Sequence, residues 1–573
     1  MVDKGAGAKE GRKPVQHDSE LVMVALGGLG EVGMNAYLYG IGPPEEREWL
    51  LVDLGITFPE GDWEPGVDVI LPDLAFIEAE KASLKGIVIT HAHEDHIGAV
   101  LELWDRLRAP IYVTPFSAGM LKTKVGEIAP GLKLDIRVVP VEGRFNAGPF
   151  DVELVNMAHS IPEVSALAIR TKHGTVFHTA DWKLDATPVI GAPTNEKRIA
   201  EIGAEGILAF VGDSTNAMRD GRSPSETEVA HSLRDIIKQA KDRVVVTTFA
   251  SNVGRVKAVA DAARASGRRL VIAGRALHRA IQVGMETGYL PKDFQYLDQQ
   301  QYSYLRRDEI VCLSTGSQGE PRAAMARLAQ NEHPDLSLDK GDLVIFSSRT
   351  IPGNEKPVGR IQNSLAMMGC DVLTDNEALV HVTGHPRRDE LRQMYAWTKP
   401  RIAIPMHGEA RHLREHAKLA RECGVKEVLI LTNGEIVRLA PGPARIIDDA
   451  PVGRLYRDGR LLVNAEDTPV RERRKLAAVG IVVVALTMTR RGDLLGEAQV
   501  ALDGVPTQND EGEPMIDLAL DAVDGCLVSI PPARRKDGAM VSEAVRRSVR
   551  SAISQAWGKK PIVKVLLNVV DTR

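Results

Sequence analysis

The chain has 573 residues, of which 44% are hydrophobic and 26% charged, and its formal net charge is −5. This composition is typical of a globular protein with a sizeable core, and the length predicts about three or four domains. Four scattered cysteines without a CxxC pair argue against a disulfide framework or a zinc ribbon and indicate a reducing cytoplasm. No apolar run approaches the ~20 residues of a membrane span, so no membrane attachment is expected.

The N-terminal part combines a polar tail with a glycine-rich turn. Residues 1–18 lack the apolar core of a secretion signal and predict a disordered tail. Gly28, Gly30 and Gly33 match the GxGxxG pattern of dinucleotide sites, which requires a helix after the turn. Residues 35–40 alternate instead as a second strand, so the sequence predicts a β-hairpin rather than a nucleotide site.

The segment 90–96, THAHEDH, follows an apolar run at 87–89 and carries most of the functional signal. Three of the six residues 91–96 are histidines, although the chain has only 15 histidines in 573 residues, so a polar loop with fortuitous histidines is not expected by chance. Imidazole nitrogens and carboxylate oxygens suit Zn²⁺ or a neighbouring first-row ion such as Mn²⁺. The pattern HxHxDH differs from the helical HExxH of metalloproteases and indicates a two-metal hydrolase.

Further metal donors are expected where apolar strands end. Polar residues at strand ends of an α/β chain gather at one edge of the sheet. Four such residues are expected beside the histidine-rich loop: Asp53, His159, Asp181 and His407. Asp53 is expected to orient a metal-bound histidine or water. Counting donors then gives two ion sites, with His91, His93 and His159 for the first, Asp95, His96 and His407 for the second, and Asp181 bridging both. Two such ions can hold an attacking hydroxide and a phosphoryl oxygen together, which is the arrangement for phosphodiester hydrolysis.

These residues resemble the metal motifs of the metallo-β-lactamase superfamily. The long gap between Asp181 and His407 resembles the β-CASP insertion of its nucleic-acid-processing members, whose motifs are matched by GDSTN at 212–216, HVTGH at 381–385 and PMHGE at 405–409. Together with GGLGEVGMN at 27–35, they resemble the ribonuclease J family. The resemblance implies an α/β fold, with a metallo-β-lactamase αββα sandwich, an inserted β-CASP α/β domain and a small α+β C-terminal domain.

The domain limits are predicted from these motifs and from composition. Residues 19–225 and 386–450 are expected to form the discontinuous metallo-β-lactamase domain, and residues 226–385 the β-CASP domain. Residues 451–466 predict a linker, and residues 467–573 a C-terminal domain. The basic residues near its end either bind RNA or a partner, or form a solvated face.

The resemblance also implies an activity. The expected protein is a metal-dependent 5′→3′ exoribonuclease with endonuclease activity on single-stranded RNA, acting in RNA decay and in 5′-end maturation of mRNA and rRNA. It would prefer a 5′-monophosphate and hold two divalent ions per subunit, Zn²⁺ first, with Mn²⁺ or Mg²⁺ as alternatives. It would form a homodimer or a tetramer and would meet RNA-degradation partners.

Residues that bind RNA and assist the chemistry are also expected. Ser, Asn and Gly at strand-to-helix switches expose backbone amides that can hold a phosphate, with simple N-capping as the alternative. The resemblance places the substrate phosphates at Phe249, Ala250, Ser251, Asn252 and at His381, Val382, Thr383, Gly384, His385. It places four residues in the catalytic centre: Asp53, Asp181, Asp213 and His385. His385 either protonates the leaving oxygen or only positions the phosphate, with Asp213 fixing its tautomer.

Two other functions are compatible with parts of the pattern. A small-molecule hydrolase on the same metal fold would share the HAHEDH loop but would have no use for a large insertion ending in HVTGH. A non-catalytic RNA-binding scaffold should have lost some metal donors, whereas every donor position is intact. If the protein is an enzyme of this class, DNA is an alternative substrate to RNA.

Overall fold

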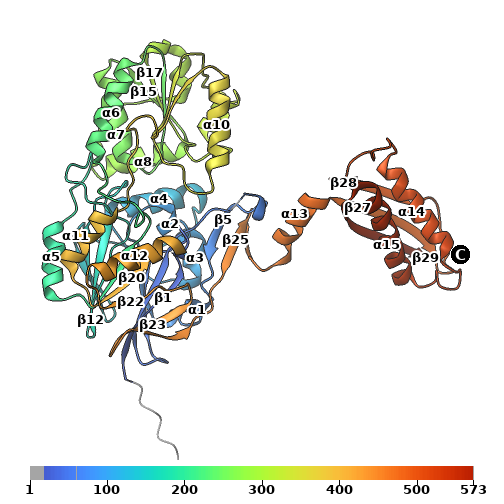
Figure 1. Cartoon of the computed structure of the whole chain (residues 1–573), viewed down its shortest axis with the longest axis horizontal. Helices are drawn as coiled ribbons and strands as arrows, with labels where there is room; N and C mark the ends of the chain where they lie inside the picture. The colour runs from blue at the N-terminus through green and yellow to red at the C-terminus, as the bar shows by residue number, and fades with distance from the viewer. Residues whose placement is uncertain (1–17, 60, 572–573) are drawn as a thin grey trace, which may run out of the picture. The chain divides into compact units, whose positions relative to one another are not determined.

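The structure, a computed structural model, describes residues 18–59 and 61–571, so the predicted tail 1–18, apart from Asp18, lies outside the described residues. The chain forms two compact units (Figure 1). The first comprises the chain up to Thr57 together with Ile70–Leu455, and the second comprises Phe58–Val69 together with the chain from Tyr456 onwards. Among the described residues, no helix is both long and apolar enough to cross a membrane.

Two mixed sheets form the centre of the first unit. The eight-stranded sheet has the order β24 (Arg445–Asp449), β23 (Glu435–Ala440), β1 (Glu20–Gly27), β3 (Ala36–Gly42), β4 (Glu48–Val52), β6 (Leu84–Val88), β7 (Ile111–Val113) and β8 (Ile136–Val138). The seven-stranded sheet has the order β22 (Glu427–Val428), β20 (Ile402–Met406), β13 (Ala209–Asp213), β12 (Gly174–His178), β11 (Ser165–Thr171), β10 (Phe150–Asn156) and β9 (Arg144–Ala147). β1 and β3 pair antiparallel, which confirms the predicted hairpin.

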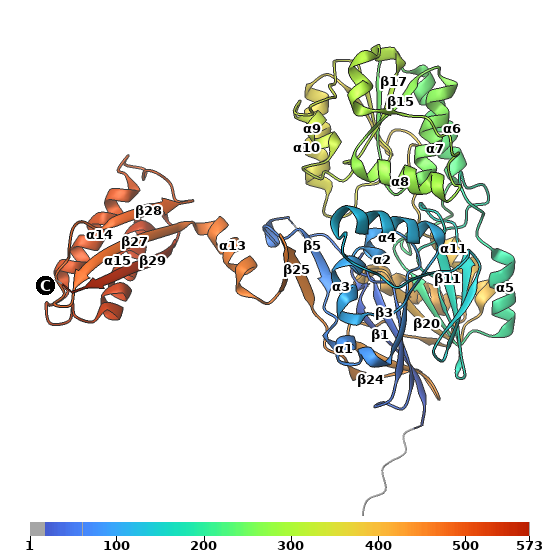
Figure 2. The ribbon, with the colours of Figure 1, turned by 180° about the vertical axis from the view of Figure 1, so that it is seen from behind.

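The two sheets pack face to face because their inner faces are apolar. One buried cluster contains Met23 and Leu50 from the eight-stranded sheet with Val152, Ile169 and Ile404 from the seven-stranded sheet. Helices cover the outer faces (Figure 2): α1 (Ala75–Ala79) and α3 (Val100–Leu107) on one side, α5 (Glu196–Glu205), α11 (Arg388–Thr398) and α12 (Ala410–Glu422) on the other. The α3 helix buries residues at helical spacing, Val100, Leu103, Trp104 and Leu107. This architecture is the predicted αββα sandwich.

A parallel six-stranded sheet is inserted between β13 and β20. Its order is β16 (Leu297–Asp298), β15 (Arg269–Ala273), β17 (Ile310–Ser314), β14 (Val244–Thr247), β18 (Leu343–Phe346) and β19 (Asp371–Leu373). Helices lie on both faces: α6 (Glu226–Gln239), α7 (Val253–Ala265) and α8 (Arg275–Glu286), then α9 (Ala324–Ala329) and α10 (Glu355–Met367). The helix α4 (Pro115–Ile128) packs against α8. Parallel strands place their carboxyl ends at one edge, where ligands bind in such sheets.

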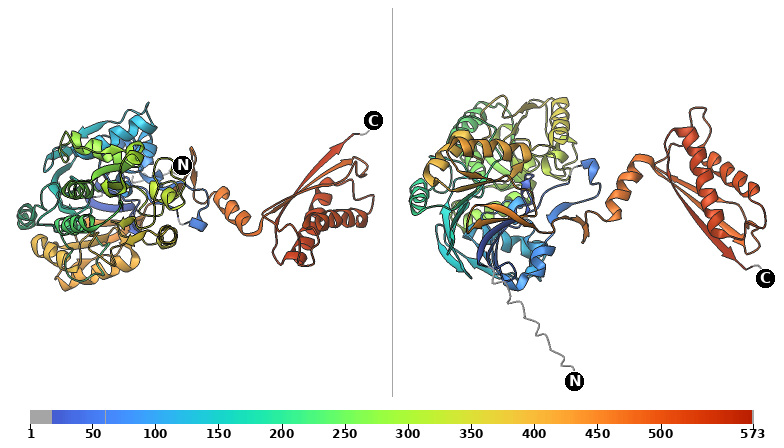
Figure 3. Two further views of the ribbon diagram at one scale, coloured as in Figure 1. Left: turned by 90° about the horizontal axis from the view of Figure 1, so that it is seen from above. Right: turned by 60° about the horizontal axis from the view of Figure 1, so that its bottom comes forward.

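The second unit contains a three-stranded sheet under two helices (Figure 3). Its elements are β28 (Gln499–Asp503), β27 (Ile481–Thr489), β29 (Ile562–Val570), α14 (Met515–Ser529) and α15 (Gly538–Trp557). Alternate residues of β27 are buried under the helices, so the opposite face of the sheet stays partly open. Residues 451–466, predicted as a linker, contain two strands, β25 (Arg454–Asp458) and β26 (Leu461–Asn464), and are followed by α13 (Thr468–Val479).

The core of the second unit can be tested by removing one side chain. Leu486 is 1% exposed within it, so Leu486→Ala should lower the free energy of unfolding of this unit by about 2–5 kcal/mol. Leu461, which is 68% exposed, provides the control, and Leu461→Ala should change that free energy by less than about 0.5 kcal/mol. Hydrogen exchange of β27 amides across a urea series measures the free energy of unfolding in both variants. Equal losses in the two variants would contradict the assignment of this core.

Candidate active site

The histidine-rich loop is fixed by backbone contacts with the segment that follows β4. The loop follows β6, and its residues 94–96 belong to the short helix α2 (Glu94–Ile97). Leu54 N donates to the His96 carbonyl at 2.8 Å, and Ile56 N donates to the Glu94 carbonyl at 3.0 Å. Gly55 lies so close that a Cβ there would stand 1.7 Å from the Asp95 carbonyl oxygen. Only glycine therefore permits this close approach, and the loop has little freedom to move.

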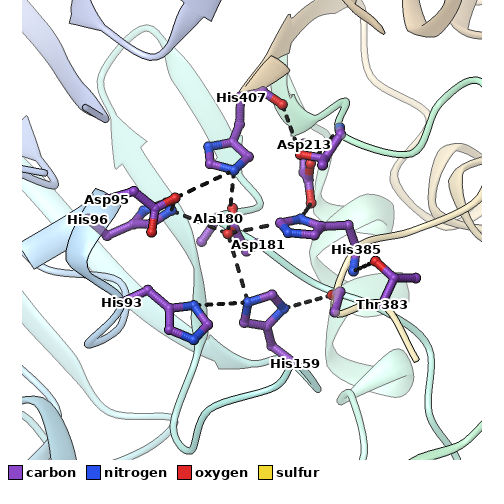
Figure 4. Close-up of polar contacts among 12 residues, drawn as sticks. His93, Asp95, His96, His159, Ala180, Asp181, Asp213, Thr383, His385 and His407 are labelled. Carbon is purple, nitrogen blue, oxygen red and sulfur yellow. Dashed lines mark hydrogen bonds and ion pairs between the residues drawn. The ribbon is translucent and has the colours of Figure 1, made fainter. Parts of the chain in front are cut away.

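The structure brings all seven predicted metal donors together. Figure 4 labels six of them, all except His91. They form two groups that share Asp181, and the donor atoms within each group lie within 4.8 Å of one another. The two groups are His91, His93, His159 and Asp181, and Asp95, His96, His407 and Asp181. This division is the one predicted from the sequence, and the role of each residue as a ligand stays a prediction.

The donor atoms converge in a way that fits divalent cations. Asp181 Oδ2 lies 3.3 Å from His96 Nε2, 3.6 Å from His407 Nε2 and 3.8 Å from His159 Nε2. Asp181 is 1% exposed, yet its Oδ1 has no hydrogen-bond partner among the described residues. A buried carboxylate oxygen without a partner is costly in free energy. Carboxylate oxygens and imidazole nitrogens at this spacing are the donor set of zinc and similar ions.

Asp53 holds the ring of His96. It is fully buried at the end of β4, and its Oδ2 lies 2.7 Å from His96 Nδ1. Thr90 donates its backbone N–H and its hydroxyl to the same carboxylate, at 2.8 and 2.9 Å. Burial raises the pKa of the Asp53 carboxyl, and His96 offsets part of that rise. With its Nδ1 directed at Asp53, His96 presents Nε2 to Asp181, so Asp53 lies where it can orient a ligand.

Asn35 is a residue of the site that the sequence did not reveal. Its side chain is fully buried, and its Oδ1 accepts a hydrogen bond from His407 Nδ1 at 2.9 Å. Its Nδ2 donates to the Asp95 carbonyl at 3.0 Å. Asn35 therefore ties the last donor of the chain to the histidine-rich loop. The available signals were that Asn35 ends the GGLGEVGMN motif at 27–35 and that it directly precedes the apolar strand β3.

Several residues around the site have strained backbones. Asp53, Ala180 and His407 have positive φ angles of 63°, 52° and 50°. Residues other than glycine rarely adopt this conformation, and it costs on the order of 1–3 kcal/mol at each position. All three lie at strand ends, next to or within the donor groups. The surrounding sandwich must therefore hold them in place.

The segment His381–His385, here called the HVTGH segment, passes beside the donors. Gly384 O accepts a hydrogen bond from His159 Nδ1 at 2.7 Å. His385 Nδ1 lies 2.7 Å from Asp213 Oδ2 and 3.9 Å from Asp181 Oδ2. Burial would lower the pKa of His385, but the charges of Asp213 and Asp181 outweigh it and raise the pKa to about 9. Asp213 and His385 thus lie beside the two donor groups, and their catalytic roles stay a prediction.

The predicted phosphate-binding residues lie at the carboxyl edge of the inserted sheet. Phe249, Ala250 and Ser251 follow β14 and are half-buried, so their backbone amides remain within reach of a ligand. The Asn252 side chain caps α7 by accepting from Arg255 N at 2.8 Å. The side chain of Asn252 therefore serves as an N-cap, which was the alternative to phosphate binding.

The fold and the donor set define a metallo-hydrolase of the metallo-β-lactamase class, and comparisons with known proteins agree. Family models match four stretches: "Metallo-beta-lactamase superfamily" at residues 29–247, "Ribonuclease J, beta-CASP domain" at 241–365, "Zn-dependent metallo-hydrolase RNA specificity domain" at 370–431 and "Ribonuclease J C-terminal domain" at 468–570. The chain is 51% identical to a ribonuclease J of Sinorhizobium meliloti, over 96% of this chain and 98% of that protein.

The chain belongs to the ribonuclease J family. A second relative, a ribonuclease J of Mycolicibacterium smegmatis, is 36% identical over 95% of this chain and 96% of its own length. A solved structure of a protein of unknown function from Enterococcus faecalis shares the fold over 73% of this chain and all of its own, with a TM-score of 0.50 and 14% identity. The protein is thus a hydrolytic ribonuclease that depends on divalent metal ions and binds RNA.

The contact between Gly384 and His159 offers a test of the site. A Cβ at Gly384 would lie 2.4 Å from His159 Cε1, so Gly384→Ala must displace either the ring or the HVTGH segment. Because neighbours that orient metal-bound histidines affect metal affinity by 10–100-fold, we expect zinc affinity to fall by at least about 10-fold. Gly359→Ala is the control, since a Cβ at Gly359 meets nothing within 4 Å. Zinc titration with a competing chelator measures the affinity of both variants. Equal affinities would contradict the close contact between Gly384 and His159.

Proposed function

We propose that this ribonuclease removes nucleotides from the 5′ end of single-stranded RNA, prefers a 5′-monophosphate and also cuts internally. Its place would be cytoplasmic RNA decay and 5′-end maturation, in contact with other RNA-degradation proteins. The observation that carries the proposal is the pair of donor groups sharing Asp181 beside the HVTGH segment. Two adjacent cation sites and a phosphate-binding segment are what in-line hydrolysis of a phosphodiester requires.

The donor groups determine which residues would hold the metals. His91, His93 and His159 would hold one ion, Asp95, His96 and His407 the other, and Asp181 would bind both. The imidazole-rich donor set favours Zn²⁺, with Mn²⁺ or Mg²⁺ as alternatives. When bound, two such ions activate water for attack on phosphorus and stabilise the charge that develops on the phosphoryl oxygens.

The protein's own residues orient the donors and the substrate. Asp53 and Asn35 hold Nδ1 of His96 and of His407, so that Nε2 of each ring faces the side of the shared carboxylate and is the atom that would bind an ion. Asp213 holds Nδ1 of His385 in the same way. The other nitrogen of His385 is then the one that can meet the substrate, and we assign it the protonation of the leaving oxygen.

The inserted sheet would supply the contacts with the RNA backbone. We assign contacts with RNA phosphates, rather than with bases, to the backbone amides of Phe249–Ser251 and to the side chains of His381 and Thr383. Binding of this kind is independent of base identity, which suits an enzyme that advances along RNA of any sequence.

We further propose a homodimer or tetramer. The edge strand β29 of the second unit carries Leu566 and Val569 at 56% and 54% exposure, and one face of its sheet is partly open. Exposed apolar residues on an edge strand support association with another copy of the chain.

The activity is tested with 5′-monophosphorylated, 3′-labelled single-stranded RNA in the presence of Zn²⁺ or Mn²⁺. We expect mononucleotides to be released from the 5′ end, and slower release from RNA with a 5′-hydroxyl. His93→Ala should abolish the release because it removes one donor of the first group. His231→Ala, at an exposed position on α6, should leave it unchanged. Internal fragments alone would make the protein an endonuclease, and no metal-dependent cleavage in any condition would refute the proposal.

The role of His385 is tested by replacing the leaving oxygen of the substrate with sulfur. A thiolate leaves without a proton, so we expect this substrate to restore most of the rate that His385→Ala loses on ordinary RNA. If His385 only positions the phosphate, the variant stays equally slow on both substrates. Rates under single-turnover conditions separate the two outcomes.

A further inference from the structure

The HVTGH segment is held separately at its two ends, and the contacts at its downstream end come from the loop after β13. Asn216 Nδ2 donates to Thr383 Oγ1 at 2.7 Å and to the His385 carbonyl at 3.2 Å. Asp213 holds the His385 ring at 2.7 Å. The position of His385 is therefore set by residues of the metal-binding part of the fold.

The upstream end is held by a buried arginine of the inserted domain. Arg255, on α7, is fully buried, and its Nη1 donates to the Val380 carbonyl at 2.8 Å and to the Ser347 carbonyl at 3.1 Å. Ser347 Oγ donates to the same Val380 carbonyl at 2.7 Å. Val380 directly precedes His381, so Arg255 fixes the backbone from which the His381 side chain projects.

A buried ion cluster connects Arg255 to the strand end that carries Asp181. Arg255 Nη2 donates to Glu226 Oε2 at 2.7 Å. Lys183 Nζ lies 3.9 Å from the other oxygen of Glu226 and 3.1 Å from Asp185 Oδ2. Asp185 Oδ2 in turn accepts the backbone N–H of Glu226 at 2.9 Å. Two cations face two carboxylates, which makes the burial of all four groups tolerable.

His381 itself has no side-chain bond that could hold it. Its Nδ1 is buried and has no hydrogen-bond partner within the described part of the chain. The ring of His385, in contrast, is bound by Asp213. Without a hydrogen bond at this nitrogen, the position of His381 depends on its backbone, and the backbone at this point is fixed through Val380.

We propose that Arg255 is a positioning residue for substrate binding: it sets His381 against an RNA phosphate, whereas Asp213 and Asn216 set His385 for the chemical step. The inference rests on the proposed function. Arginine suits this position because its planar guanidinium binds two carbonyls and a carboxylate at once, which a lysine ammonium on a flexible stem does not do.

The test uses the full-length protein with the substitution Arg255→Lys. This variant keeps a positive charge opposite Glu226 but loses the planar guanidinium that donates to several acceptors at once. For 5′-monophosphorylated RNA we expect KM to rise by about 10-fold, as for loss of a charge-assisted hydrogen bond, with kcat within about twofold of the wild type. Asn216→Ala, at the other end of the segment, should instead act mainly on kcat, with only a smaller rise in KM through Thr383.

Arg268→Lys is the matched control. Arg268 belongs to the same inserted domain and also donates to backbone carbonyls, those of Asp242 (2.6 Å) and Ala240, but it precedes β15 and makes no contact with the HVTGH segment. Both kinetic constants should be unchanged in this variant. Thermal melting and zinc content confirm that each variant is folded. If Arg255→Lys does not fold, Ser347→Ala removes the hydroxyl that donates to the Val380 carbonyl and accepts from Arg255 Nη1. This variant keeps the bond from Arg255 to Val380 and should raise KM alone, by a smaller factor.

The outcomes separate this inference from the proposed function. Unchanged constants in folded Arg255→Lys, or a fall in kcat at constant KM, would overturn the positioning role. Equal damage to kcat and KM would show that Arg255 is only structural. A wild-type protein that does not cleave RNA from its 5′ end would instead refute the proposed function.

Discussion

The Asp181 carboxylate is buried among five imidazoles, and the rest of the first unit depends on keeping it there. Ring nitrogens of His91, His96, His159, His385 and His407 all lie within 3.9 Å of one of its oxygens. Such a group is costly to bury unless its partners are held rigidly. The sandwich provides this rigidity. Histidine partners of Asp181 follow strands of both sheets, and the apolar core between the sheets fixes where each strand ends.

Rigidity also explains why the backbone around the site can be strained. The positive φ angles of Asp53, Ala180 and His407 and the close approach of Gly55 to the Asp95 carbonyl would relax in a looser fold. Here each is surrounded by paired strands. The same reasoning applies to Asn35 and Asp53, which hold ligand rings through single hydrogen bonds and can do so only because both are fully buried and immobile. Orientation of the donors is thus a property of the whole sandwich.

The sequence was sufficient for the fold class, which the resemblance of its motifs to a known family implied, and for the residues that gather at the site, which follow from local patterns. Histidine density identified the loop 90–96, and polar residues at strand ends identified His159, Asp181 and His407. Asn35, Lys183 and Arg255 were missed because their partners are distant in the chain: Asn35 binds His407, and Arg255 binds Val380. The grouping of Phe58–Val69 with the C-terminal unit was missed for the same reason. The strands in the predicted linker were hidden by Pro451 and by its mixed charges.

One pairing in the seven-stranded sheet has an evolutionary consequence. β13 and β20 are parallel neighbours in which Asp213 lies opposite Met406, the residue before His407. Neighbouring strands stand about 4.8 Å apart whatever the chain does between them. The spacing of Asp213 and His407 is therefore set by a backbone ladder and not by the length of the segment that joins the two strands, and lengthening that segment costs little additional entropy. Insertions and deletions between them can remodel substrate selection over generations while the spacing of the reacting groups is inherited unchanged.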